Sequence, residues 1–227
     1  MKPAINSKRK FGDTRLLLFN QEEKIEHQRV NDLINYFNAG DVLVINKSAT
    51  MPSSLMAKID RSGEEVEIRL AAFQGKSASN LDDWAAFSFG SGSWKDQTEE
   101  RGIPAEIRIG DRLIFSESLK AIVLNVDKER LLKIKFIANN IAQEVYKVGK
   151  PIQYSYLEEE LGVWDQQTVF SSIPVSVEPP SASFVFDWNL VLKLKEKGVK
   201  VVGLLHSAGI SSMEKELWFK TACSIWL

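Results

Sequence analysis

Hydrophobic positions recur with two different periods along the chain, and the change of period divides the chain into three stretches. In the first stretch, residues 16–19 and 42–45 form apolar runs of strand length. Four apolar residues between them share the spacing of one helix face: Val30, Leu33, Ile34 and Phe37. Gly40 predicts the end of that helix, and the charged residues 22–27 predict a turn before it.

In the middle stretch, from Leu55 to about Phe136, apolar and polar residues alternate, as is typical of half-buried strands. Six segments follow this pattern: residues 55–60, 66–73, 84–89, 106–115, 121–126 and 131–137. Glycines separate them and no helical spacing intervenes, so we expect a compact antiparallel barrel or sandwich. An amphipathic helix over residues 141–148 follows, ended by Gly149 and Pro151.

The third stretch, residues 174–212, predicts a strand–helix–strand unit. A Pro-rich loop leads into an apolar run at 184–186 that has strand length. Asp187 stands where a helix N-cap is expected, and Gly198 suits the left-handed position that ends the helix. Residues 199–205 predict a buried strand. Beyond Ser212, a further helix face is predicted by Leu217, Trp218, Ala222 and Ile225.

The three stretches together predict a mixed α/β fold with an inserted antiparallel β-barrel domain. Residues 1–54 and 149–227 are expected to build one discontinuous α/β domain, and residues 55–148 the barrel-like domain. In α/β proteins, ligand sites lie at the carboxyl ends of the strands. The polar loops that begin at Asn46 and at His206 are therefore candidate site loops.

Composition narrows the class of protein. Hydrophobic residues make up 44% of the chain and charged residues 26%, which is ordinary for a globular protein. No apolar run is long enough to cross a membrane, and the basic N-terminus lacks the apolar core of a signal peptide, so we expect a cytoplasmic protein without a membrane span. One cysteine and two histidines argue against a disulfide or a metal site. A net charge of −1 argues against binding by broad phosphate neutralisation, although a local basic patch stays possible.

Four segments in order carry a resemblance to a known family. They are GDVLVINKSATMPSSL at 40–55, GKPIQYSYL at 149–157, DQQTVFSSIPVSVEPPSASFVF at 165–186 and LKEKGVKVVGLLHSAGISS at 194–212. These segments, around a β-insert, make nearly the whole chain similar to the S-adenosylmethionine:tRNA ribosyltransferase-isomerases of queuosine biosynthesis. The resemblance implies that residues 167–170 form a strand.

The resemblance also implies an activity, with S-adenosylmethionine as ribosyl donor and no metal. In that chemistry a base removes a proton beside the sulfonium and adenine leaves. The aminomethyl group of a 7-aminomethyl-7-deazaguanine in tRNA attacks the sugar, and rearrangement to an epoxy-cyclopentanediol releases methionine. The implied partner is tRNA or a related deazaguanine acceptor. Such a reaction needs a positioned base and a pocket that excludes water.

Candidates for the base are His206, at a strand end, and Glu178, in the Pro-rich loop. The candidate substrate-binding residues are Asn46, Ser48, Tyr156, Gln167, Thr168, Pro180, Ser181, Ser207 and Gly209. Each has a structural alternative: Asn46 as the head of an Asx turn, Gln167 and Thr168 as one polar face of a strand. Tyr154, Tyr156 and Trp164 either stack on a base or pack between domains.

Several positions depart from the family pattern. Lys47, Ser48 and Ala49 replace an Asn or Asp, a Thr and an Arg, and Ser54 replaces a second Arg. The loop from His206 has one Gly fewer, and the Gly-Thr-Thr-x-x-x-Arg and Asn-Phe-His-x-Pro motifs do not occur. An alternative function is therefore that of a catalytically inactive, C-terminally shortened paralogue that binds nucleosides or proteins. An incomplete gene product is a third possibility, and a homodimer would cover an edge left exposed.

Overall fold

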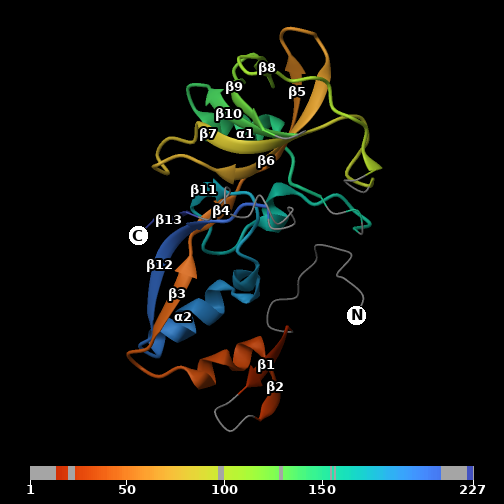
Figure 1. Ribbon diagram of the computed structural model, residues 1–227. Helices are drawn as coiled ribbons and strands as arrows, with labels where there is room; N and C mark the ends of the chain where they lie inside the picture. The colour runs from red at the N-terminus through yellow and green to blue at the C-terminus, as the bar shows by residue number, and fades with distance from the viewer. Residues whose placement is uncertain are drawn as a thin grey trace.

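Six antiparallel strands close into a barrel in the upper half of the computed structural model (Figure 1). The structure describes residues 14–19, 24–96, 100–127, 130–153, 155 and 157–210, and the backbone of 224–226. The barrel strands are β5 (Ser54–Ile59), β6 (Glu65–Phe73), β7 (Asp83–Phe89), β8 (Arg112–Ile114), β9 (Lys120–Asp127) and β10 (Leu131–Ile137). Their order around the barrel is β10-β7-β6-β5-β8-β9. Closure confirms the barrel and removes the edges that an open sheet would expose.

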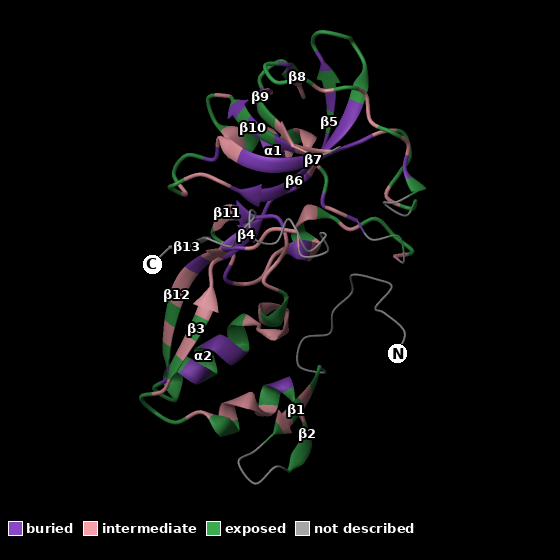
Figure 2. Cartoon of the chain, viewed as in Figure 1, coloured by how far each residue is buried: buried purple, intermediate pink, exposed green. Residues whose placement is uncertain are grey.

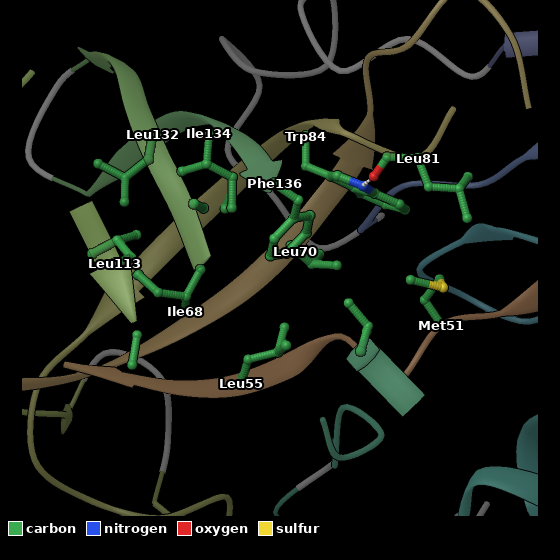
Figure 3. Packing of buried hydrophobic residues seen from close by; sticks show 14 of the residues in the cluster. Met51, Leu55, Ile68, Leu70, Leu81, Trp84, Leu113, Leu132, Ile134 and Phe136 are labelled. Carbon is green, nitrogen blue, oxygen red and sulfur yellow. Dashed lines mark hydrogen bonds between the residues drawn. The ribbon is translucent and has the colours of Figure 1, made fainter. Parts of the chain in front are cut away.

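The barrel interior is filled by the apolar residues of the alternating pattern. Side chains from β5, β6, β7, β8 and β10 point inward (Figure 3), and Leu55, Ile68 and Ile134 are fully buried. The Trp84 ring packs on Phe73, with ring centroids 5.3 Å apart, and its indole nitrogen donates to the Leu81 carbonyl at 2.8 Å. The predicted helix α1 (Ile141–Val148) covers one end and buries Val145.

The lower half is an α/β layer built from both flanks of the barrel, which confirms the predicted fold class. Strand β3 (Val42–Asn46) pairs in parallel with β12 (Lys200–Ser207), and β4 (Ser48–Thr50) pairs in parallel with β11 (Ile173–Ser176). Strands β1 (Arg15–Phe19) and β2 (Ile25–Arg29) form a hairpin, and β13 (Ser224–Trp226) runs antiparallel to β12. The domain boundaries stay a prediction.

Helix α2 (Trp188–Glu196) covers one face of the β3–β12 pair, and its ends follow the sequence signals. The Asp187 carboxylate accepts the Leu190 amide at 2.7 Å, as an N-cap does. Gly198 follows the helix with a φ of +89°, a conformation that glycine adopts without strain. Leu190 and Leu194 are buried against Val30 of the 3-10 helix η1 (Val30–Tyr36).

The two halves share one continuous core. Met51, Val175, Val177 and Leu205 come from the α/β layer and belong to the same buried cluster as the barrel interior. Figure 2 shows the buried residues continuing from β6 into β4 and β11. On the outer face of the barrel, Ile210 packs against a second cluster and its amide donates to the Ala71 carbonyl at 2.8 Å.

Several local predictions were wrong. The turn predicted over 22–27 is in part strand β2, while residues 20–23 lie outside the described residues. The helix predicted over 30–37 is present, but as the 3-10 helix η1, which ends at Tyr36. The strand predicted over 106–115 shortens to β8, because residues 108–111 turn at Gly110, with a φ of +90°, around the Asp111 carboxylate, which accepts the Arg108 amide at 2.9 Å.

Three predictions near the C-terminal flank were also wrong or lie partly outside the described residues. The apolar run 184–186 is not a strand but the end of the 3-10 helix η4 (Ser181–Val185), in which the Ser183 amide donates to the Pro180 carbonyl at 2.9 Å. Residues 167–170 form a turn rather than a strand. The predicted C-terminal helix falls mostly on residues 211–223, outside the described residues, and Ile225 lies in strand β13.

None of the helices in the described part of the chain is long and apolar enough to span a membrane. Among the same residues, no three His, Cys, Asp or Glu side chains gather as a metal site would require.

Candidate functional site

Three loops, each of which follows a strand, meet where the α/β layer joins the barrel (Figure 1). They follow β3, β11 and β12. Because β3 and β12 are parallel, their carboxyl ends lie at the same edge of the sheet. The Lys47 amide, just beyond β3, donates to the Leu204 carbonyl at 2.8 Å and keeps the two chains together there.

The Asn46 carboxamide connects the first of these loops to the third. Its Nδ2 donates to the His206 carbonyl at 3.0 Å, and its Oδ1 accepts the His206 amide at 3.0 Å. The same Oδ1 accepts the Ser48 amide at 3.0 Å, which is the Asx-turn contact expected of an Asn at a strand end. The side chain of Asn46 therefore holds the backbone on both sides of the edge.

Three buried hydroxyl groups connect the second loop to the other two. The Ser176 Oγ lies 2.8 Å from the Ser48 Oγ and accepts the Ala208 amide at 3.0 Å. The Ser207 Oγ donates to the Val175 carbonyl at 2.5 Å. Because each hydroxyl is buried and bonded within the protein, Ser48 and Ser207 stabilise the junction directly.

The Gln167 carboxamide binds backbone groups of the adjoining strand β4, as the Asn46 carboxamide does for His206. Its Oε1 accepts the Thr50 amide at 3.0 Å, and its Nε2 donates to the Thr50 carbonyl at 2.9 Å. The Tyr146 hydroxyl of α1 donates to that carbonyl too, at 2.7 Å, and burial raises the pKa of Tyr146. Thr168, in contrast, forms a local turn in which its amide donates to the Ser171 Oγ at 2.9 Å.

The Pro-rich loop after β11 lies beside the loop after β12. The amides of Val177 and Glu178 donate to the Ala208 carbonyl, at 2.8 and 3.3 Å, so Glu178 lies beside the segment that continues to Gly209. Pro180 is half-buried and Ser181 is exposed at the start of η4.

His206 lies within β12, one residue before its end, with a half-buried side chain. Asn46 bonds both of its backbone groups, but its imidazole makes no hydrogen bond with the described residues. Alternation along β12 directs the ring to the side opposite Leu205, the side of the half-exposed Val202. Among the candidate residues of these loops, His206 thus combines a fixed backbone with an available titratable ring.

The structure therefore brings most of the predicted residues to one junction. Asn46, Ser48, His206 and Ser207 are hydrogen-bonded into a single network, with Glu178 and Gly209 on the adjoining segments. Gln167 attaches to the network's edge through β4. Tyr154 and Tyr156 lie outside the described residues, and Trp164 is 83% exposed. Direct contact of any of these residues with a substrate stays a prediction.

A second polar cluster on the barrel was not predicted from the sequence. Glu67 and Arg69 of β6 and Arg101 are only 7%, 9% and 5% exposed. The Glu67 carboxylate accepts from Arg69 Nε at 2.6 Å, from Ser54 Oγ at 2.7 Å and from Arg101 Nη1. Arg101 Nη2 also donates to the carbonyl of Gly90 at 2.8 Å. Burial opposes the charge, but these three donors outweigh it and hold the pKa of Glu67 below its ordinary value.

A weak signal for this cluster exists in the sequence. Glu67 and Arg69 are charged residues two apart in a strand whose remaining residues after Glu65 are apolar, and this spacing places both on the face opposite Ile68. Arg101 lies 34 residues further along the chain, and only the folded barrel brings it to Glu67.

Comparison with known proteins relates this chain to one protein family. A model of the queuosine biosynthesis protein family matches residues 3–218. S-adenosylmethionine:tRNA ribosyltransferase-isomerases of Chloroherpeton thalassium and Amoebophilus asiaticus are each 27% identical to this chain. The matches cover 88% and 89% of the chain but 55% and 56% of those proteins. The chain thus spans about half the length of the curated relatives it matches. A crystal structure of S-adenosylmethionine tRNA ribosyltransferase from Thermotoga maritima is 21% identical, with a TM-score of 0.32, over 91% of this chain and 53% of that one.

Replacement of Asn46 tests the role of its carboxamide in the junction. Asn46→Ala removes three hydrogen bonds and leaves half-buried backbone groups without partners, so the free energy of unfolding should fall by about 1 to 3 kcal/mol. Asn125→Ala makes the same change at an exposed position of β9 and should stay within about 0.5 kcal/mol of the parent. Urea denaturation measures both, and equal losses would refute the structural role of Asn46.

The Glu67 cluster predicts a defined loss of stability in acid. Because the pKa of Glu67 is lower in the folded chain than in the unfolded chain, its contribution is complete above the ordinary pKa and is lost as the pH falls through the folded value. Between about pH 5 and pH 3, Glu67→Gln should therefore lose less stability than the parent. Glu65→Gln, a change at an exposed position of the same strand, should leave the slope of the free energy of unfolding against pH unaltered. Parallel slopes for the parent and Glu67→Gln would contradict this assignment.

Proposed function

Because the chain belongs to the family of queuosine biosynthesis proteins, we propose that it acts in queuosine modification of tRNA as an S-adenosylmethionine-dependent ribosyltransferase-isomerase. The observation that carries the proposal is the junction around His206. Its three loops belong to three of the four family-like segments of the sequence, and a continuous hydrogen-bond network ties them together. We propose this junction as the reaction site.

In the proposed reaction, His206 is the base. Its imidazole takes the proton from the carbon beside the sulfonium of S-adenosylmethionine, and the glycosidic bond breaks to release adenine. A carbon–nitrogen bond then forms with the aminomethyl group of the deazaguanine. The sugar then rearranges to the epoxy-cyclopentanediol: a carbon–oxygen bond of the epoxide forms as the carbon–sulfur bond breaks, and methionine leaves as its thioether with the bonding electrons on sulfur. Asn46 supports His206 in this role, because its bonds to both His206 backbone groups limit the positions that the ring can take.

The groups at the junction fit a sulfonium donor. A sulfonium is a cation without an N–H or O–H group to donate, so oxygen atoms are its suitable neighbours. The loop after β11 supplies the Glu178 carboxylate and the Ser181 hydroxyl, and it lies against Ala208, two residues from His206. We assign to Glu178 a charge-stabilising role beside the donor, and to Pro180 and Ser181 the shaping of its nucleoside end.

A specific observation favours the second candidate function, a nucleoside- or protein-binding module without catalysis. Asn46, Gln167 and Ser207 direct their polar atoms to backbone groups of the protein. Ala49 and Ser54 stand where the family pattern has arginines, so charged contacts to a substrate are fewer. A junction of this kind would bind the donor and leave it intact.

The proposal is tested with the purified chain, S-adenosylmethionine and tRNA that carries 7-aminomethyl-7-deazaguanine. We expect release of adenine and methionine, measured by chromatography. His206→Ala should lower the rate by about 10²- to 10⁴-fold, the usual contribution of a positioned base. His27→Ala, the other histidine of the chain, lies in the hairpin strand β2 and should leave the rate unchanged.

Calorimetry with S-adenosylmethionine separates the two functions. Binding without release of adenine would support the non-catalytic module. A chain that is folded but neither binds the donor nor releases adenine would exclude both the enzyme and a module for this nucleoside.

A further inference from the structure

A pocket of about 280 Å³ lies on the outer surface of the barrel, and none of the residues that line it belongs to the network around His206. Its walls come from β5 and β6, from the loop at residues 93–94, from the end of α1 and from the connection at residues 150–160. The side chains of Arg69, Lys150, Trp94 and Met56 line it. Three separate regions of the sequence, residues 54–69, 93–94 and 148–160, thus converge on one small pocket.

Arg69 supplies hydrogen-bond donors that the described residues do not use. Of the five N–H groups of its guanidinium, the Nε–H donates to Glu67, while both Nη groups lack a hydrogen bond to the described residues. The residue is only 9% exposed, and the Phe89 ring lies 4.6 Å from its guanidinium carbon. The Nη groups stay accessible to solvent, and a fork of accessible donors suits an anion with two or more oxygens, such as phosphate.

The charges of the pocket also favour an anion. The single charge of Glu67 is met by two arginines, Arg69 and Arg101. Lys150 and Glu160 form an ion pair at the rim, with Nζ and carboxylate oxygen 3.2 Å apart, so their opposite charges cancel. One positive charge is therefore in excess. Arg101 Nε is moreover the only buried side-chain nitrogen or oxygen of the described residues without a hydrogen-bond partner.

The remaining wall of the pocket suits a planar ring. The half-buried Trp94 offers an indole, and Met56, Val148 and Pro151 add apolar surface. Aromatic side chains bind nucleic-acid bases by stacking, largely without regard to base identity. A cationic fork and a half-buried indole in one pocket are the combination that recognises a phosphate and a base together.

We propose that this pocket binds one nucleotide, with its phosphate on Arg69 and Lys150 and its base against Trp94. The volume lies near the lower end of ligand pockets, about 300 to 1,000 Å³, and suits one nucleotide rather than two. The nucleotide comes either free, as a nucleoside monophosphate, or as one unit of an RNA strand. The site is independent of the ribosyl transfer proposed above and requires no S-adenosylmethionine.

Isothermal titration calorimetry with two probes tests the proposal on the full chain. The probes are guanosine 5′-monophosphate and a single-stranded five-nucleotide oligoribonucleotide. Binding of both identifies a site for any nucleotide, and binding of the oligonucleotide alone identifies a site for RNA. Either result supports the proposal, and affinity should fall as salt rises. Absence of binding by both probes at millimolar concentration overturns it.

Matched variants assign the binding to this pocket. Trp94→Ala and Lys150→Ala should each weaken it about tenfold, the loss of one stacked base or one phosphate contact. Lys58→Ala and Trp188→Ala remove an exposed lysine and an exposed tryptophan elsewhere and should bind as the parent does. Arg69→Lys keeps the positive charge but loses the forked donors. Its affinity for the probes is interpreted only if its melting temperature matches that of the parent. Equal affinity in the parent, Trp94→Ala and Lys150→Ala would overturn the assignment.

Discussion

The Asn46 carboxamide is the interaction on which the arrangement of the junction depends. Strand β3 ends at Asn46 and β4 begins two residues later, so backbone groups at this break lose their sheet partners. Asn46 replaces them, because it accepts the amides of Ser48 and His206 and donates to the His206 carbonyl. Backbone groups away from water need such partners. The chain can therefore leave one parallel pair and enter the next without exposing its backbone.

The position of His206 follows from the same constraint. Its backbone is held by Asn46, and the next residues are held by Ser176 and by the Val175 carbonyl. Leu205, its neighbour in β12, is buried in the cluster that fills the barrel. The backbone of His206 therefore has few alternative positions, and a fixed attachment of the ring is the condition that acid–base chemistry requires. The proposed nucleotide pocket lies on the outer surface of the barrel, beside the buried cluster of Glu67, Arg69 and Arg101.

Much of the fold could be predicted because one face of each barrel strand is buried. The alternation in residues 66–73 and 131–137 identified strands β6 and β10 to within one residue, and Asp187 and Gly198 correctly marked the limits of α2. Alternation alone left a barrel and a sandwich equally open, because both bury one face of each strand. The strand predicted at Phe184–Phe186 was wrong. Its aromatic and β-branched residues favour a strand, whereas contacts after Pro180 impose a 3-10 turn.

The candidate site was predicted less completely, for a different physical reason. The loops were identified correctly because their residues follow strands, and the Asx turn at Asn46 needs only two residues of separation. The pairs Gln167–Thr50 and Arg101–Glu67 form between segments 117 and 34 residues apart, and no local pattern indicates them.

His206 is the group proposed to meet the donor, and nuclear magnetic resonance can observe this ring directly, because the chain has only two histidines. Titration of S-adenosylmethionine into the protein, with the imidazole nitrogens labelled, should shift the His206 signals and leave those of His27 in place. Unchanged His206 signals at a donor concentration that calorimetry shows to be saturating would contradict the account.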